Sequence, residues 1–441
     1  MASRPGTEVD AMARPFWLTK LLVQSGLARL LPFARRLADG GTDCLHYYSD
    51  QVLAAPVEEL LDPAHFPVAG PEAIDLNLAA PRFESSVSLG RVTADRRGNP
   101  PPWGLPELRR SIAEFEFRRD ARIVDAEREV FVTHGATAAF ASVLDAFVNP
   151  GDRVVLFDPC SPLFSLGARS RRADVHWVPV RNENGECRFN TRVFEKAMRR
   201  AKLLVLANPA NPTGACLTPE DLESIARIAV KRDVIVFADE SFPCTDALAR
   251  FPSQLPGFRL LTSGSVSQRW GLGSLRVGWL TGPRHLVKAC ALMANLHAPY
   301  VPTICQQIAA SAIETSPPAE PSCEKRRFVL DRLRMLGFDP DPPAGGYFVW
   351  VNVAGLSLTG RTFAERLLKE QRVLVGPGCA FGPSGANYVR ISFAAEDGRL
   401  REGLARLASF VRSLRGEPAW VEPAAAEPIL AESQAPVFSR V

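Results

Sequence analysis

Between about residues 130 and 265, short apolar runs alternate with stretches of helical periodicity. The apolar runs are nearly continuous, and helical stretches such as Ala136–Phe147 and Pro219–Arg232 separate them. The runs are Val130–Thr133, Arg153–Phe157, Leu203–Ala207, Val234–Ala238 and Leu260–Ser263. Strands that are apolar on both faces and alternate with helices predict an α/β fold with a mostly parallel central sheet. In such folds, ligands bind at the carboxyl ends of the strands.

A second region, from about Ser322 to Arg415, mixes helices with short strands at Tyr347–Asn352 and Tyr388–Phe393. This mixture predicts a smaller α+β domain. We therefore divide the chain into an N-terminal extension (1–40), an N-terminal part of the small domain (41–75), a large domain (76–310), a C-terminal small domain (311–415) and a disordered tail (416–441). The tail is predicted from its content of Pro, Ala and Glu.

The N-terminal extension interleaves apolar and basic side chains over residues 15–38, which predicts an amphipathic helix interrupted near Pro32. Such a helix packs on the protein or on a partner, or lies on a membrane surface, and the sequence leaves these alternatives open. The segment has neither the uninterrupted apolar run nor the clear cleavage site of a signal peptide.

Composition narrows the class of protein further. Of the 441 residues, 46% are hydrophobic and 23% are charged, which excludes wholesale disorder. No run of about 18 uncharged apolar residues occurs, so we expect no transmembrane segment. A net charge of +4 does not favour a nucleic-acid partner. The nine cysteines are scattered and never spaced as C-x-x-C, which indicates a reducing compartment, the cytoplasm, and no metal site.

Polar segments follow four of the predicted strands. Residues 133–137 (THGAT) lead from a strand through a glycine into a helix, an arrangement that presents main-chain N–H groups to an anion such as phosphate. Residues 208–214 (NPANPTG) form a rigid turn that directs an amide side chain inward. Asp239 ends a buried strand and requires a cationic or hydrogen-bonding partner. Residues 265–278 bring two hydroxyl groups and an arginine together, a set suited to a phosphate dianion.

In this order and spacing, the four segments resemble those of class I/II aminotransferases, which are fold-type I pyridoxal 5'-phosphate (PLP) enzymes. The resemblance extends from about Ile74 to Ser413 and includes LPELR at 105–109, PAGGYF at 343–348 and VGPG at 375–378. It implies an aspartate-aminotransferase-like fold, with a large PLP-binding domain and a smaller α+β domain. It also implies a homodimer and a small-molecule amine or amino acid as substrate.

The resemblance assigns roles to individual residues. The cofactor phosphate would be held by Gly135, Ala136, Thr137, Ser265, Ser267 and Arg276. Asn211 would hydrogen-bond the hydroxyl group of the cofactor ring, and Asp239 would pair with the pyridinium nitrogen. Arg390 would bind the substrate α-carboxylate, a task that suits its planar guanidinium.

The sequence departs from the family at the position of the Schiff-base lysine, which is Gln268 here. The register is fixed because Gly271, Arg276 and Gly278 fall where the family places them. A glutamine amide is neither nucleophilic nor basic, so Gln268 neither holds the cofactor aldehyde nor moves the substrate proton. We therefore expect noncovalent PLP, or pyridoxamine 5'-phosphate (PMP).

Three more positions depart from the family. Ser161 replaces the aromatic residue that stacks on the pyridine ring, Phe242 replaces a tyrosine that shares the ring hydroxyl, and Asn99 replaces a tyrosine contributed across the dimer. An engineered lysine substitution would explain Gln268 alone, so we favour a natural lineage. His134 and Arg269 are candidate substitute bases, and Tyr47 or Tyr48 is a candidate to replace the lost stacking or hydroxyl contact.

Two functions stay open at this point. The first is an aminotransferase-like enzyme that acts on an amino-acid-type substrate by atypical, lysine-independent chemistry. The second is a catalytically inactive pseudo-aminotransferase that serves as a ligand-binding or dimer-partner protein. The ligand-binding positions Asn211, Asp239, Arg276 and Arg390 favour the first, whereas the four departures favour the second.

Overall fold

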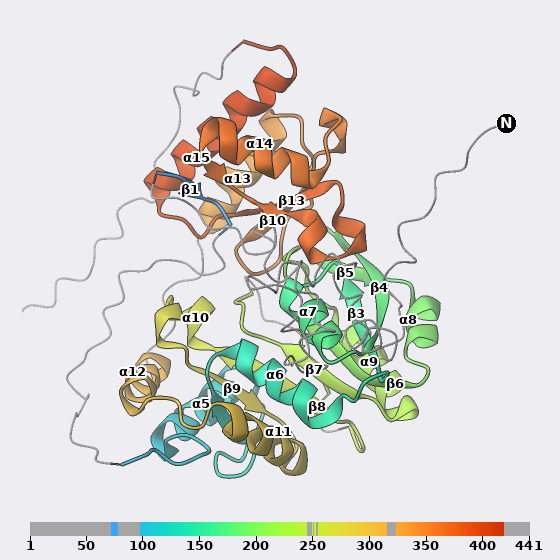
Figure 1. Ribbon diagram of the computed structural model, residues 1–441, viewed down its shortest axis with the longest axis vertical. Helices are drawn as coiled ribbons and strands as arrows, with labels where there is room; N and C mark the ends of the chain where they lie inside the picture. The colour runs from blue at the N-terminus through green and yellow to red at the C-terminus, as the bar shows by residue number, and fades with distance from the viewer. Residues whose placement is uncertain are drawn as a thin grey trace, which may run out of the picture.

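The computed structural model describes residues 72–77, 98–244, 249, 251–252, 255–314 and 323–418. The amphipathic segment 15–38, Tyr47, Tyr48 and most of the predicted tail lie outside the described residues. Residues 98–314 build the larger part of the molecule, and residues 323–418 together with 72–77 build the smaller part above it in Figure 1. No described helix is long and apolar enough to cross a membrane.

An eight-stranded sheet forms the centre of the larger part, in the order β2-β9-β8-β7-β6-β3-β4-β5. The strands are β2 (Val130–Thr133), β3 (Arg153–Asp158), β4 (Asp174–Glu183), β5 (Glu186–Phe189), β6 (Ala201–Ala207), β7 (Ile235–Asp239), β8 (Leu260–Ser265) and β9 (Gly278–Thr281). Strands β8, β7, β6, β3 and β4 run parallel, while β9 is antiparallel to both of its neighbours. This arrangement confirms the predicted α/β class.

The predicted strands agree with the observed ones apart from a few terminal residues. β2 has the predicted bounds, whereas β8 extends two residues further, to Ser265. These two residues, Gly264 and Ser265, pair with Trp279 and Gly278 of the antiparallel neighbour β9. An apolar run does not reveal this extension, because the pairing partner lies elsewhere in the sequence.

Helices cover both faces of the sheet. One face packs against α6 (Ala136–Phe147), α7 (Pro162–Ser170) and α11 (Arg284–His297), and the other against α8 (Thr191–Ala197) and α9 (Pro219–Arg232). Within β3, Val154 and Leu156 face the first group of helices, whereas Val155 and Phe157 face the second. Both faces of the sheet are therefore shielded from solvent, which explains why the strand sequences are nearly continuous apolar runs. The remaining helices of this part are α5 (Pro106–Asp120), α10 (Val266–Arg269), η5 (Gly273–Leu275) and α12 (Thr303–Glu314).

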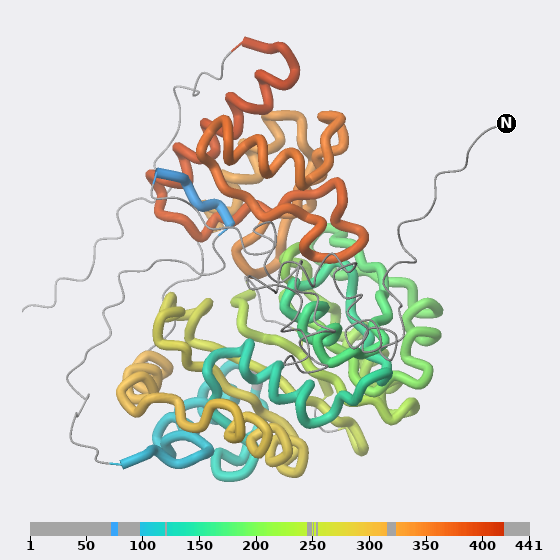
Figure 2. Tube along the Cα trace, in the orientation of Figure 1, coloured from blue at the N-terminus to red at the C-terminus, as the bar shows by residue number. Residues whose placement is uncertain are grey.

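The smaller part joins two short sheets to three α-helices and three short 3-10 helices. Its strands are β1 (Ile74–Asp75), β10 (Phe348–Asn352), β11 (Val373–Leu374), β12 (Gly376–Pro377) and β13 (Tyr388–Ser392). Its helices are α13 (Cys323–Met335), η6 (Ala354–Leu356), α14 (Gly360–Gln371), η7 (Gly378–Phe381), η8 (Pro383–Gly385) and α15 (Asp397–Leu414). Figure 2 shows β1, far away in sequence, lying against this C-terminal region, where it pairs with β11.

The two parts meet where the PAGGYF segment crosses the turns that follow β6 and β7. The main-chain N–H of Gly345 donates to the carbonyl of Gly214 at 2.9 Å, and that of Gly346 donates to Pro243 at 2.8 Å. The hydroxyl of Tyr347 donates to the main-chain carbonyl of Gln268 at 2.7 Å. The segments predicted to carry chemistry therefore lie at this junction.

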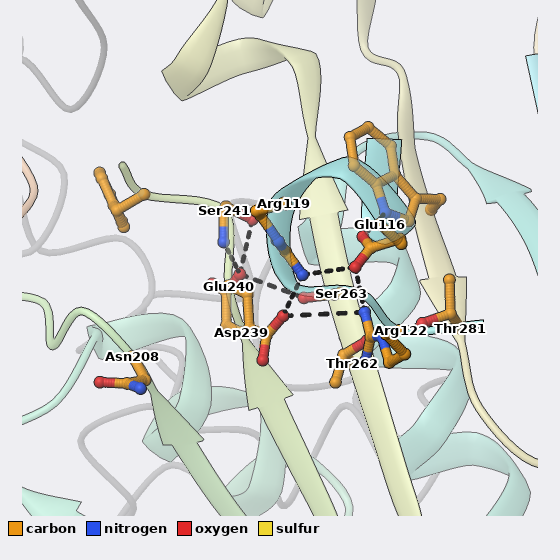
Figure 3. A network of polar contacts seen from close by, with 12 residues as sticks. Glu116, Arg119, Arg122, Asn208, Asp239, Glu240, Ser241, Thr262, Ser263 and Thr281 are labelled. Carbon is orange, nitrogen blue, oxygen red and sulfur yellow. Dashed lines mark hydrogen bonds and ion pairs between the residues drawn. The ribbon is translucent and has the colours of Figure 1, made fainter. Parts of the chain in front are cut away.

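A buried ion-pair network attaches α5 to the end of β7 (Figure 3). Arg119 donates to Glu116 and, at 2.7 Å, to Glu240, and Arg122 donates to the same Glu116 carboxylate. The indole N–H of Trp279 donates to the other carboxylate oxygen of Glu116 at 3.1 Å. Burial raises the pKa of Glu116, but the two arginines outweigh burial and hold that pKa below its ordinary value.

We expect Glu116→Gln to lower the free energy of unfolding at pH 7 by about 3–5 kcal/mol, because it leaves two buried guanidinium groups short of a counter-charge. A carboxylate with a lowered pKa stabilises the fold above its unfolded pKa, about 4.3, and loses that effect as the pH falls through the folded value. The difference from wild type should therefore shrink on acidification.

Urea unfolding at pH 7 measures the loss of stability, and the same measurement at about pH 3–4 shows how far it shrinks on acidification. The lower pH lies below the pKa of an unfolded glutamate, about 4.3. Glu114→Gln is the matched control, since Glu114 is exposed on the same helix, and it should change stability by less than about 0.5 kcal/mol. Equal stability of the two variants would contradict the structural role of the network.

Candidate functional site

Four of the predicted segments lie at one edge of the large sheet. Gly135 follows β2, and residues 208–214 follow β6. Asp239 is the last residue of β7, and Ser265 is the last residue of β8. Arg390 comes from β13 of the smaller part. The structure thus places groups from both parts of the molecule around the carboxyl ends of the parallel strands.

Two glycines allow the start of α6 to approach its neighbours closely. Gly135 has a positive φ of 81°, and a Cβ atom there would lie 2.6 Å from Nη2 of Arg276. A Cβ atom on Gly278 would lie 2.6 Å from the carbonyl carbon of Gly135. Both positions therefore require glycine, which brings the first turn of α6 against Arg276.

The region around Gly135 is suited to an anion. The first amides of α6, at Ala136 and Thr137, begin a twelve-residue helix that has no side-chain cap at Gly135. The guanidinium of Arg276 contacts only main-chain oxygens, of Gly273 at 3.3 Å and of His134 at 3.5 Å. Arg276 forms no ion pair with any described carboxylate, and it is exposed. Helix amides and an uncompensated cation therefore fit a phosphate group.

The two predicted serines lie together beside this region. Ser265 caps α10 by accepting the main-chain N–H of Ser267 at 3.0 Å, and the two hydroxyl oxygens lie 2.9 Å apart. Both side chains are buried. The cap fixes the direction of the short helix that carries Gln268.

Asp239 is held by hydroxyl donors. Its Oδ1 accepts the hydroxyl of Ser241 at 2.6 Å, the main-chain N–H of Ser241 at 3.1 Å and the hydroxyl of Ser263 at 3.1 Å. Burial raises the pKa of Asp239 above its ordinary value, although these hydrogen bonds oppose the shift, and the neighbouring charge of Glu240 adds to it. A cationic ring nitrogen opposite Asp239 would reverse this penalty.

Arg390 is buried at the junction of the two parts. Its Nη1 donates to Oδ1 of Asn211 at 2.8 Å, and its Nη2 donates to the Asn77 side chain at 2.5 Å. The rings of Phe348 and Phe381 lie 4.1 and 4.8 Å from the guanidinium carbon. Burial lowers the pKa of Arg390 to about 9, although the nearby negative charge of Asp75 opposes this shift. The site therefore contains a buried cation whose hydrogen bonds among the described residues all go to neutral groups.

Gln268, Phe242 and Ser161 lie at the same junction or near it, whereas Asn99 is exposed in the segment before α5. Gln268 belongs to α10, and its side-chain Oε1 is buried without a hydrogen-bond partner among the described residues. Phe242 is buried against Phe348, with ring centroids 5.3 Å apart. Ser161 directly precedes α7 and is half-buried.

Sequence reasoning weighed His134 and Arg269 as bases. The guanidinium of Arg269 donates to the main-chain carbonyl of Phe242 at 2.7 Å, and a cationic donor of this kind does not accept protons. The Nε2 atom of His134 is buried and has no hydrogen-bond partner among the described residues. Sequence reasoning missed Asn77, Tyr347 and Glu240; for Glu240 the signal was its place directly after Asp239.

Comparison with known proteins places this geometry in a family. The sequence pattern of "Aminotransferase class I and II" matches residues 88–407, more than half of the chain. The arginine–pyruvate transaminase AruH of Pseudomonas aeruginosa is 32% identical over 369 residues, which are 79% of this chain and 92% of that protein. An aspartate aminotransferase of Pyrococcus abyssi is 31% identical over 325 residues, or 71% of this chain and 83% of that one.

Solved structures agree with this result. A Pyrococcus protein matches with a TM-score of 0.71 and 27% identity, covering 85% of this chain and 99% of its own. The aspartate aminotransferase of Thermus thermophilus with maleate matches with a TM-score of 0.71 and 25% identity, covering 82% and 98%. The chain therefore belongs to the class I and II aminotransferase family, whose members depend on PLP and its aminated form PMP.

Proposed function

We propose that this protein binds PLP or PMP without a covalent bond to lysine and acts on an amino-acid-type substrate by lysine-independent chemistry. The observation that carries this proposal is Arg390, a buried cation whose hydrogen-bond partners among the described residues are the neutral Asn211 and Asn77. A buried charge of this kind is costly unless an anion pairs with it. The α-carboxylate of an amino acid is such an anion, and it matches the planar guanidinium.

The described residues also suggest how the cofactor is held. The amides of Ala136 and Thr137, together with Arg276 and the serines 265 and 267, would bind its phosphate. Asp239 would keep the ring nitrogen of the cofactor protonated. When bound, PLP supplies an electron-withdrawing ring that stabilises negative charge at the substrate α-carbon.

The distribution of lysines supports the lysine-independent part of the proposal. Six of the seven lysines are described, and none belongs to a segment at the junction. They are Lys196 in α8, Lys202 at the start of β6, Lys231 in α9, Lys288 in α11, Lys325 in α13 and Lys369 in α14. Proton transfer at the substrate α-carbon would then fall to the substrate, to solvent or to a group other than lysine.

The alternative function is an inactive pseudo-aminotransferase that binds ligands or partners. Phe242 favours this alternative. The family resemblance implies a tyrosine hydroxyl at this position, whereas the Phe242 ring is apolar and packs against Tyr347 and Phe348. Retention of the buried Arg390 cation favours the enzyme, and the experiments below separate the two functions.

A titration with PLP, followed by absorbance spectroscopy, borohydride reduction and intact-mass measurement, tests how the cofactor is held. We expect saturable binding with no gain in mass on reduction, because Gln268 offers no amine. Gln268→Lys should bind PLP and gain the mass of one reduced cofactor.

Two results would contradict the proposal. A covalent adduct in the wild-type protein would mean that another lysine serves. An absence of PLP binding in both proteins would favour the inactive alternative. Lys288→Arg, in an exposed helix position, is the control and should behave as wild type.

The role of Arg390 is tested by ligand pairs that differ only in the carboxylate. The PLP-loaded protein is titrated with L-alanine and with ethylamine while its absorbance spectrum is recorded. We expect L-alanine to bind more tightly than ethylamine. Arg390→Ala should reduce the ratio of the two dissociation constants about 10- to 100-fold, the range expected for lost charge-assisted hydrogen bonds. An unchanged preference in Arg390→Ala would show that the carboxylate binds elsewhere.

We also propose that the chain forms a homodimer. Leu292 and Leu296 of α11 are 58% and 72% exposed, and Ile304 of α12 is 53% exposed. Such apolar side chains on neighbouring elements favour burial against a second copy. Sedimentation equilibrium should therefore report a dimer, and Leu296→Glu should weaken it. A wild-type monomer at micromolar concentration would contradict this assembly.

A further inference from the structure

We propose that Arg269 is a positioning residue that holds the turn bearing Asp239 in a fixed relation to Gln268. The turn comprises residues 239–242 and is called the carboxylate turn below. Nη2 of Arg269 donates to the carbonyl of Phe242 at 2.7 Å and lies 3.4 Å from that of Glu240. The inference rests on the function proposed above, since it gives Arg269 a role toward the group that meets the cofactor ring.

The orientation of Asp239 depends on the main chain of the carboxylate turn. Two of the three hydrogen bonds that its Oδ1 accepts come from Ser241, which belongs to the turn itself. If the main chain of the turn rotates, these two donors move with it and the carboxylate loses its orientation. The third donor, Ser263, lies on the neighbouring strand β8 and cannot fix the carboxylate alone.

Arginines from different elements hold this turn. Arg119 of α5 binds the side chain of Glu240, and Arg269 of α10 binds main-chain carbonyls of the turn. Figure 3 shows Arg119 reaching Glu240 beside Asp239. Hydrogen bonds from a charged donor are stronger than those between neutral groups. The main-chain contacts of Arg269 therefore constrain the backbone that carries Ser241.

The backbone and side chain of Arg269 are restrained as well. Arg269 directly follows Gln268, whose main-chain carbonyl accepts the hydroxyl of Tyr347 at 2.7 Å. The Ser265 side chain caps the same short helix. The guanidinium of Arg269 also lies over the ring of Phe115, 5.8 Å from its centroid, which restricts its own movement. A side chain restrained at its base and along its length can transmit a fixed spacing to the carboxylate turn.

A double-mutant cycle with Asp239 tests the proposal through PLP affinity and the circular dichroism of bound PLP. We expect Arg269→Ala to raise the Kd for PLP about 10-fold, the effect of losing one charge-assisted hydrogen bond, and to change the dichroism. In an Asp239→Ala background, the same substitution should have almost no further effect, because its action runs through that carboxylate. Arg269→Lys should restore part of the affinity.

Arg227→Ala, at an exposed position of α9, is the control and should leave both readouts unchanged. The proposal is overturned if Arg269→Ala binds PLP like wild type, or if it costs the same affinity with and without the Asp239 carboxylate. If Arg269→Ala fails to fold, Arg269→Gln, which keeps a neutral donor, is measured in the same cycle and judged by the same criteria. Failure of the wild-type protein to bind PLP would instead overturn the proposed function, and this inference with it.

Discussion

The hydrogen bond from Arg390 to Asn211 joins the smaller part of the molecule to the turn after β6, and the arrangement of the site depends on it. The bond is 2.8 Å long, and both residues lie where the two parts meet. Because the guanidinium is buried between two aromatic rings, it cannot exchange this partner for water. The Gly345 and Tyr347 contacts align the same two surfaces, so strand β13 is held over the carboxyl ends of the large sheet.

The arginines around the site have two different kinds of surroundings. Arg119 and Arg122 lie between the carboxylates of Glu116 and Glu240, so their charges are compensated within the fold. Arg390 and Arg276 contact only neutral oxygens among the described residues. A compensated pair contributes to structure, whereas a buried cation such as Arg390, whose hydrogen-bond partners are neutral, raises the free energy of the unliganded protein. The contrast distinguishes the arginines that stabilise the fold from those that we propose to bind a ligand.

The sequence predicts local features of this site well and long-range contacts poorly. The bounds of β2 and α6 follow from an apolar run, a glycine and a helical period, all within 20 residues of chain. The contact of Arg390 with Asn77 spans 313 positions, and that of Arg119 with Glu240 spans 121. Neither pair leaves a periodic signal, because each residue taken alone looks like an ordinary surface charge or amide. Such partners become visible only when the topology brings the elements together.

The hydrogen bonds around Gln268 show which of its groups have a partner within the described residues. Its main-chain carbonyl accepts a hydrogen bond from the Tyr347 hydroxyl, and the side chain of the next residue, Arg269, donates to the carboxylate turn. Its side-chain Oε1 alone is buried without a donor among the described residues. A buried carbonyl oxygen left without a partner costs about 1–3 kcal/mol, whereas an apolar residue there would cost nothing of this kind. A polar side chain in this place therefore suits a bound ligand that supplies the missing donor.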